Sequence, residues 1–263
     1  MGFLKNRVAI LSFGFIALIA LLAIFAPWIT HYSYEEQNIL ERLQGPSLQH
    51  WMGTDTLGRD LFSRIIYGAR MSLAVGIITT LAALVIGTCV GALAGYRGGW
   101  VDDLLMRFVD MIYIFPSVLL AILVMIFLGR GFTGILVALS ITAWVTQARL
   151  VRGQMIQIRE LPYIEAARAV GVSPLRLITR HILPNLIGTI IVSMTIQIPT
   201  QIMSESFLSF IGLGLQPPYS SWGTLAQEGF RAMQSYPHLI LFPGSVLFVT
   251  LLAFHFVGEG LQT

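Results

Sequence analysis

Charged residues are scarce in this chain, and lysine is nearly absent. Only 11% of its 263 residues are charged, whereas 56% are hydrophobic. Soluble proteins carry about 25% charged residues, so a chain this poor in charge cannot cover itself with a water-soluble surface. The sequence therefore predicts an integral membrane protein rather than one or two soluble domains.

Several signatures of chemistry are also lacking. Cys89 is the single cysteine, which excludes an intrachain disulfide and a cysteine metal cluster. The chain contains no HExxH pair, no GxSxG turn and no GxxxxGKS/T phosphate loop. Its basic residues stand singly between apolar runs, so nucleic acid is not a predicted partner. These absences argue against a metalloenzyme, an intramembrane hydrolase and a nucleotide-binding subunit.

Six apolar runs are long enough to cross a bilayer, which takes about 20 largely apolar residues. Only backbones that satisfy their own hydrogen bonds are stable in hydrocarbon, so we expect an all-α polytopic protein with six transmembrane helices. The first run is too long for a cleaved signal peptide and should remain as a span. The predicted spans are about 8–29, 73–96, 111–128, 134–151, 186–211 and 239–258.

Basic residues are distributed unevenly between the two sides of these spans. With both termini in the cytosol, ten basic residues lie inside and six outside, as the positive-inside rule requires. The chain then divides into an N-terminal span with an extracytoplasmic segment, 1–70, and a five-helix core, 71–263. The ten inner residues are Lys5, Arg7, Arg97, Arg107, Arg149, Arg152, Arg159, Arg168, Arg176 and Arg180.

The largest cytosolic segment, 152–184, contains two short helices separated by turn residues. Pro162 suits the start of the first helix, and Gly171 suits its end. Ser173 is a good cap for the second helix, and Pro184 is expected to break the chain before the fifth span. A short alanine-rich helix here suits insertion into a groove of a partner protein. An amphipathic loop lying on the membrane surface explains the same pattern equally well.

This segment resembles the EAA loop of ABC-importer permeases. The family's pattern is EAA, three residues, G, nine residues and then I-x-L-P. The chain matches it except at His181, where the pattern has isoleucine. On this resemblance, the residues expected to couple the chain to an ATPase are Glu165, Ala166, Ala167, Arg168, Gly171, Leu183 and Pro184.

Other stretches resemble the dipeptide, oligopeptide and nickel permease family, and specifically its C-type subunit. They cover residues 50–73, 94–107, 205–218 and 221–223. The resemblance implies an ABC type I importer fold in a prokaryotic cytoplasmic membrane, with both termini cytosolic. It implies peptide cargo, and nickel or a metal–metallophore complex is the alternative.

The resemblance also implies a set of partners. These are a second homologous permease, two cytosolic ATPase subunits and an extracytoplasmic substrate-binding protein, together with membrane lipid. The ATPase subunits would bind ATP and magnesium, so no cofactor is expected in this chain. A role as an enzyme is likewise not expected.

The fifth span carries a polar side chain at every fourth position. Ser193, Gln197, Gln201 and Glu205 would form a slanting stripe along one helix face. Polar groups facing lipid are unfavourable, so the stripe should face a cavity or another helix. One hypothesis is that it lines a translocation path between two permeases. The alternative is hydrogen bonding between helices.

The outer stretch 53–60 is rich in glycine, aspartate and threonine, which predicts a tight turn before a short helix. On that helix, Asp60 and Arg64 have the spacing of an ion pair. The stretch would dock a binding protein or simply lead into the second span.

A secondary transporter or channel is the alternative from another functional class. Such proteins often place ionisable groups in mid-membrane or use matched broken helices. The predicted span interiors lack charges except for Glu205, and no inverted repeat is visible. The sequence therefore favours a permease driven by separate ATPases.

Overall fold

The computed structural model describes residues 6–262, so Lys5 lies outside the described part. Within that part the regular structure is helical, which confirms the predicted all-α class. Five helices are long and apolar enough to cross a membrane, and a bent pair of helices, counted as one, gives a sixth candidate span. The five are α1 (Arg7–Ile24), α3 (Leu61–Arg97), α6 (Phe132–Arg159), α9 (Leu183–Phe210) and α11 (His238–Gln262).

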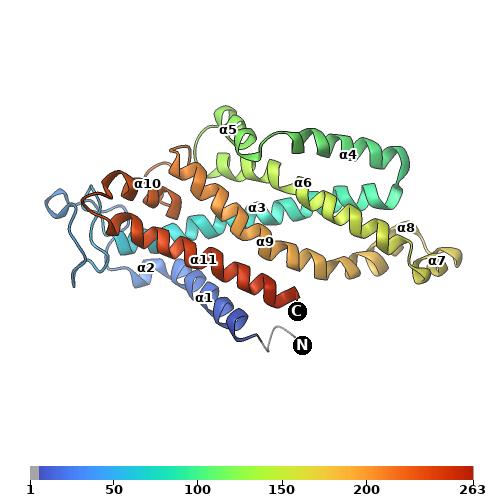
Figure 1. The fold of residues 1–263 in the computed structure, drawn as a ribbon, viewed down its shortest axis with the longest axis horizontal. Coiled ribbons are helices and arrows are strands. Elements are labelled where there is room, and N and C mark those ends of the chain that lie inside the picture. Colours follow the sequence, from blue (N-terminus) through green and yellow to red (C-terminus); the bar gives the residue numbers. More distant parts are fainter. Residues whose placement is uncertain (1–5, 263) are drawn as a thin grey trace.

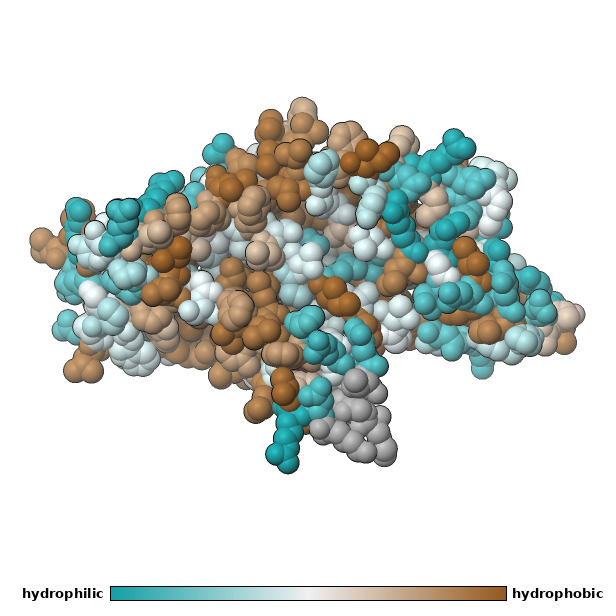
Figure 2. Space-filling view, viewed as in Figure 1, coloured by the Kyte–Doolittle hydropathy of each residue, from teal (hydrophilic) through white to brown (hydrophobic). Residues whose placement is uncertain are grey.

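Shorter elements gather at the two ends of the molecule (Figure 1). The α7 and α8 helices lie at one end, and α10 lies at the other with the loops that precede α3. Figure 2 shows hydrophobic residues across the middle of this face and hydrophilic ones towards both ends. The short elements are α2 (Ala26–Ile29), a 3-10 turn η2 (Ile39–Glu41), α7 (Pro162–Ala169), α8 (Pro174–Leu177), a π-helical turn η3 (Ile178–Ile182) and α10 (Trp222–Ala232).

The third span differs from its prediction. Instead of one helix over 111–128, α4 (Gly99–Ile114) and α5 (Ser117–Leu128) meet at an angle of 88°. The break falls at Phe115 and Pro116, which are both extended, with ψ values of 133° and 120°. Proline disfavours a helical conformation in the residue before it, so the apolar run cannot continue as one straight helix.

Two arginines of α6 hold α4 in place. Arg152 donates to both carboxylate oxygens of Asp102, with Nε–Oδ1 and Nη2–Oδ2 distances of 2.5 and 2.6 Å. Arg149 donates to Asp110 at 2.6 Å, and its guanidinium carbon lies 3.8 Å from the centroid of the Tyr113 ring. These contacts hold α4, the first helix of the bent pair, against α6.

Helix α3 is longer than a bilayer is thick. Its 37 residues rise about 55 Å, whereas a bilayer with its headgroups is about 40–45 Å thick. Arg70 and Arg97 are 27 positions apart, a helical rise of about 40 Å, so these arginines fit the two headgroup regions. The first turns of α3 then project beyond the membrane, and the expected division between residues 70 and 71 falls inside this helix.

Helices α3 and α6 approach each other closely along three glycines. A Cβ on Gly87 would lie 2.6 Å from the Gln147 Cβ, and one on Gly95 would lie 2.7 Å from the Met155 Cβ. At Gly91 a Cβ would come within 3.0 Å of the backbone of Ala148. This small-residue repeat, with a spacing of four, lets helix backbones touch in a membrane. The two helices therefore pack through a seam that tolerates no side chain on α3.

Candidate functional site

The α7 helix has well-defined ends. Pro162 occupies its first turn, as predicted, and Gly171 stands just after it with φ +80°. The Gly171 N–H donates to the Arg168 carbonyl at 3.0 Å, and the Val172 N–H donates to the Ala167 carbonyl at 3.1 Å. This pair of bonds is the Schellman arrangement, which requires a left-handed residue at the glycine position. The EAA residues therefore lie on a helix whose end is fixed by Gly171.

One buried side chain anchors α7 to the rest of the molecule. Ile164 is fully buried in a cluster with Met155 and Ile158 of α6 and with Leu186 of α9. Most of the remaining helix faces outwards, including Glu165, Ala166 and Arg168. The arrangement presents a short charged and alanine-rich surface at the tip of the protein (Figure 1).

Leu183 and Pro184 do not end a helix, which corrects the expectation that Pro184 breaks the chain. Helicity continues from α8 through η3 into α9, and the Leu183 N–H bonds to the Ile178 carbonyl in the five-residue pattern of a π turn. Pro184 lies in the first turn of α9, directly after this wider π turn, and helicity continues through it although proline has no N–H to donate. Leu183 packs partly against the Ile164 cluster. The α8 helix, the η3 turn and the fifth span are thus one continuous helical rod, and the turn at Gly171 separates this rod from α7.

The predicted polar stripe of α9 separates into two environments. Gln197 and Gln201 line a cavity of about 230 Å³ between α5, α6 and α9. Ser193 is buried and donates to the Ile190 carbonyl of its own helix at 2.8 Å. Glu205 is fully buried elsewhere, so the four residues do not face one common space.

Glu205 is surrounded by serines. Ser209 donates to its Oε1 at 2.7 Å, and Ser72 and Ser206 lie 3.3 and 3.4 Å from its Oε2. Ser72 also accepts the backbone N–H of Trp222 at the start of α10. Glu205 therefore joins α3, α9 and α10 within the subunit.

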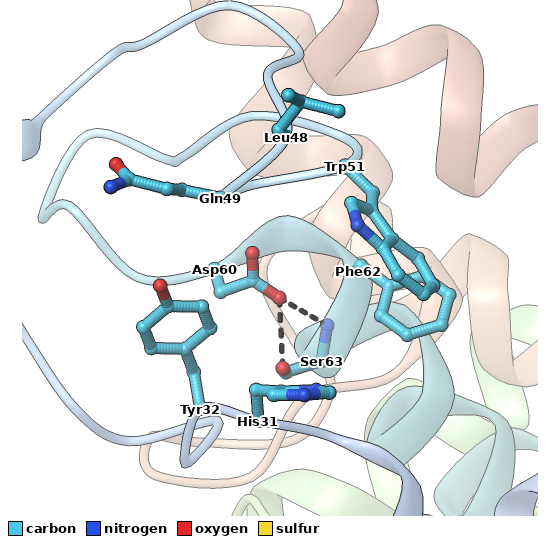
Figure 3. Close-up of a pocket in the computed structure, with 8 residues that line it drawn as sticks. All are labelled: His31, Tyr32, Leu48, Gln49, Trp51, Asp60, Phe62 and Ser63. Carbon is cyan, nitrogen blue, oxygen red and sulfur yellow. Dashed lines mark hydrogen bonds between the residues drawn. The ribbon is translucent and has the colours of Figure 1, made fainter.

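The start of α3 differs from the predicted ion pair. Asp60 does not pair with Arg64, because it caps α3 and accepts from the Ser63 N–H and hydroxyl at 2.7 and 2.8 Å (Figure 3). Its other oxygen lies 2.9 Å from Nδ1 of His50, which stacks near Tyr32. The predicted tight turn is present, with Gly53 and Gly58 at positive φ values.

Arg64 instead joins two distant carboxylates. It is 2% exposed, and its Nη1 lies 2.5 Å from both Asp55 Oδ2 and Glu228 Oε2. Arg59 contacts the same two residues, at 2.7 and 3.2 Å. This outer ion cluster, made of Asp55, Arg59, Arg64 and Glu228, ties the loop before α3 to α10.

Some site residues were missed by sequence reasoning. Gln147 of α6 meets the polar stripe, since the Gln197 amide donates to its Oε1 at 2.8 Å. The sequence signal that could have identified Gln147 was a single amide side chain within an apolar span. Asn185 donates to the Tyr163 hydroxyl at 3.1 Å and so links α9 to α7. No regular spacing connects these two residues, so no pattern predicted the link.

Two family models match the chain. One, described as the binding-protein-dependent transport system inner membrane component, matches residues 87–263. The other, described as the N-terminal TM domain of oligopeptide transport permease C, matches residues 2–46. Together they cover both the N-terminal span and most of the helices that build the EAA segment and the cavity.

Named relatives match over almost the whole chain. The oligopeptide transport system permease protein OppC of Bacillus subtilis is 42% identical over 260 residues, which are 99% of this chain and 85% of the relative. The dipeptide transport system permease protein DppC of Alkalihalophilus pseudofirmus is 44% identical, over 98% and 85%. The glutathione transport system permease protein GsiD of Pectobacterium atrosepticum is 41% identical, over 99% and 87%.

Solved structures agree on the fold. An inward-facing form of the MetNI methionine ABC transporter superposes with a TM-score of 0.62 at 18% identity, over 74% of this chain and 93% of that chain. An amino acid ABC transporter superposes with a TM-score of 0.58 at 17% identity, over 75% and 92%. The family models, the relatives and the helical architecture agree, and the chain belongs to the binding-protein-dependent transport system inner membrane components, the permease subunits of ABC importers.

Proposed function

We propose that this chain is the translocation subunit of a peptide importer. It pairs with a second homologous permease and with two cytosolic ATPase subunits, and an extracytoplasmic binding protein delivers its cargo. ATP and magnesium bind to the ATPase subunits, where hydrolysis takes place. The named relatives support peptide cargo over nickel or a metallophore complex, since their names specify oligopeptide, dipeptide and glutathione transport.

The observation that carries this proposal is the exposed, sharply ended α7 helix at one tip of the molecule. A single buried anchor, Ile164, leaves Glu165, Ala166 and Arg168 open to a partner. Small side chains allow a groove to close around the helix, and the two charges fix its orientation. Because α7 continues through a tight turn into the α8–α9 rod, a partner that moves α7 also moves a spanning helix.

The α7 end faces the cytosol in this proposal. The positive-inside distribution supports that orientation. Helices α1 and α11 run antiparallel, and the end of α1 and the start of α11 lie towards the same end of the molecule as α10 (Figure 1). Both termini then lie on the cytosolic side of a prokaryotic cytoplasmic membrane. The loop 30–60 and α10 face the binding protein.

Reconstituted transport tests the function. The chain, its partner permease, both ATPases and the binding protein are placed in proteoliposomes with a labelled peptide. We expect uptake that requires ATP and all the subunits. Uptake by this chain without ATPases, driven by an ion gradient, would instead identify a secondary transporter.

Two substitutions test the coupling role of α7. Glu165→Lys reverses an exposed charge, and Gly171→Trp forces a bulky residue into φ +80°, a conformation that L side chains rarely adopt. Each should lower peptide uptake at least about tenfold, equivalent to about 1.4 kcal/mol of coupling. The ATPases should either continue to hydrolyse ATP or dissociate, as measured by phosphate release and by co-purification.

Glu160→Lys is the matched control, because Glu160 is exposed on the same side but precedes α7. It should retain uptake and assembly. If both α7 variants also transport and assemble normally, α7 only caps the membrane surface.

A further inference from the structure

The cavity between α5, α6 and α9, here called the amide chamber, has an uncharged polar lining. Its volume is about 230 Å³, and the residues around it are alanines, aliphatic side chains, serines, threonines and two glutamines. Pockets that enclose a whole drug-sized ligand measure about 300–1,000 Å³. The chamber therefore fits a segment of a longer molecule, and that segment carries no charge.

Three glutamine atoms at this place have no hydrogen-bond partner among the described residues. They are Gln147 Nε2, Gln197 Oε1 and Gln201 Oε1. The one bond between them, from Gln197 Nε2 to Gln147 Oε1, uses one end of each amide. Exchanging oxygen and nitrogen in both amides only moves the unpaired atoms, because a carboxamide has both donors and an acceptor to satisfy. All three atoms are buried in this conformation, and buried polar groups are nearly always paired. Gln197 and Gln201 line the chamber, so a rotation of their carboxamides about the last side-chain torsion, which is broad, would turn their oxygens toward an occupant.

The hydroxyl groups around the chamber offer acceptors. Thr142, Thr200 and Ser204 each donate to a carbonyl of their own helix, at 3.0, 2.8 and 2.8 Å. Their oxygens keep lone pairs for a donor inside the chamber. Thr146 also lines it and is exposed. The lining thus combines free acceptors, amide donors and the small apolar surfaces of Ala121 and Ala143.

We propose that the amide chamber binds the peptide main chain, through hydrogen bonds between its glutamines and a main-chain N–H and C=O. This inference rests on the proposed function and specifies what that function's cargo presents to the spans. A main-chain amide is an uncharged unit with one donor and one acceptor. Its N–H is what the Gln197 and Gln201 oxygens lack, and its C=O can accept from a carboxamide nitrogen. Since every peptide carries it, the site accepts peptides of differing side chains.

Hydrogen bonding between helices is the competing explanation of these glutamines. It accounts for the Gln147–Gln197 bond. It leaves Gln201 unexplained, because Gln201 is 7% exposed, lines the chamber and hydrogen-bonds no described side chain. Helix joining would then require a partner for Gln201 from the second permease, and such a contact would be insensitive to methylation of the cargo.

N-methylated peptides test the proposal, because methylation removes a main-chain N–H and leaves the charges unchanged. The complete transporter is reconstituted, and its binding protein is loaded to saturation with a neutral tripeptide or with the same peptide methylated at its central amide. One lost hydrogen bond corresponds to about a tenfold change in rate, so the wild type should transport the methylated peptide about tenfold more slowly. In Gln201→Met the parent peptide should slow and this ratio should fall to about 1, because the acceptor of the methylated N–H has been removed.

Two further variants make the outcome unambiguous. Gln201→Leu removes the same carboxamide with a differently shaped side chain, and it should lower the ratio to the same extent as Gln201→Met. Gln157→Met alters an exposed glutamine of α6 outside the chamber and should keep the wild-type ratio.

The proposal is overturned if Gln201→Met or Gln201→Leu assembles and retains the wild-type ratio, or if the wild type transports both peptides equally. Either result would make the glutamines a packing device in a working peptide importer. Absence of any ATP-dependent peptide uptake by the wild type would instead remove the proposed function itself.

Discussion

Replacing Gly91 with leucine should abolish the folded subunit. The new Cβ would overlap the backbone of Ala148, which cannot rotate away as a side chain can. Overpacking a core costs about 1–3 kcal/mol where side chains can adjust, and a backbone clash in the α3–α6 seam should reach or exceed about 3 kcal/mol. We expect a large loss of monodisperse protein after detergent extraction, measured by size-exclusion chromatography of a fluorescent fusion.

A glycine elsewhere in the membrane provides the control. Gly14 lies within α1, and a Cβ there would meet nothing within 4 Å. Gly14→Leu should therefore yield nearly as much folded protein as the wild type. Equal yields from Gly91→Leu and Gly14→Leu would mean that α3 and α6 do not pack through the glycine seam.

Replacing Arg64 with methionine should strongly destabilise the outer part of the protein. Arg64 is buried and bridges Asp55 and Glu228, so its removal leaves the carboxylates with Arg59 alone. Removing one partner of a buried ion pair costs about 3–5 kcal/mol. Because Glu228 is one-third exposed, we expect the lower end, about 3 kcal/mol. Thermal unfolding of the purified subunit measures the change.

Arg64→Lys should be intermediate, because one ammonium cannot donate to two carboxylates with the geometry of a guanidinium. Arg42→Met, at an exposed outer arginine, should leave the unfolding temperature nearly unchanged. If Arg64→Met unfolds at the wild-type temperature, the outer ion cluster contributes no net stability.

The sequence alone predicted the parts of the fold that depend on hydrophobic composition and on the residues that begin and end a helix. Apolar runs predicted where the chain crosses the membrane, and Pro162 and Gly171 predicted both ends of α7. Hydropathy contains no information on the direction of a helix axis. The 88° bend between α4 and α5 was therefore invisible in the apolar run, although Pro116 offered a local signal.

The ion pairs could not be derived from spacing. Asp60 and Arg64 are four residues apart, but the pairing rule requires both to be in the helix. Asp60 is the cap, with ψ 119°, and its side chain turns back to Ser63. Arg64 pairs with Glu228, which is 164 residues away. Contacts of this kind depend on how helices assemble, so a single sequence does not encode them as a pattern.

The continuity of α8, η3 and α9 has a mechanical consequence. Ile178 and Gln201 are separated by about 35 Å of continuous helix. This stretch includes the π-helical turn η3 and Pro199, two kinds of site at which helices bend. A tilt applied at the α7 contact would therefore be divided between these two bends, and the part that passes Pro199 would shift Gln201 and change the width of the amide chamber. Cargo release would then depend on the stiffness of two short helical turns, with no relay of side chains required.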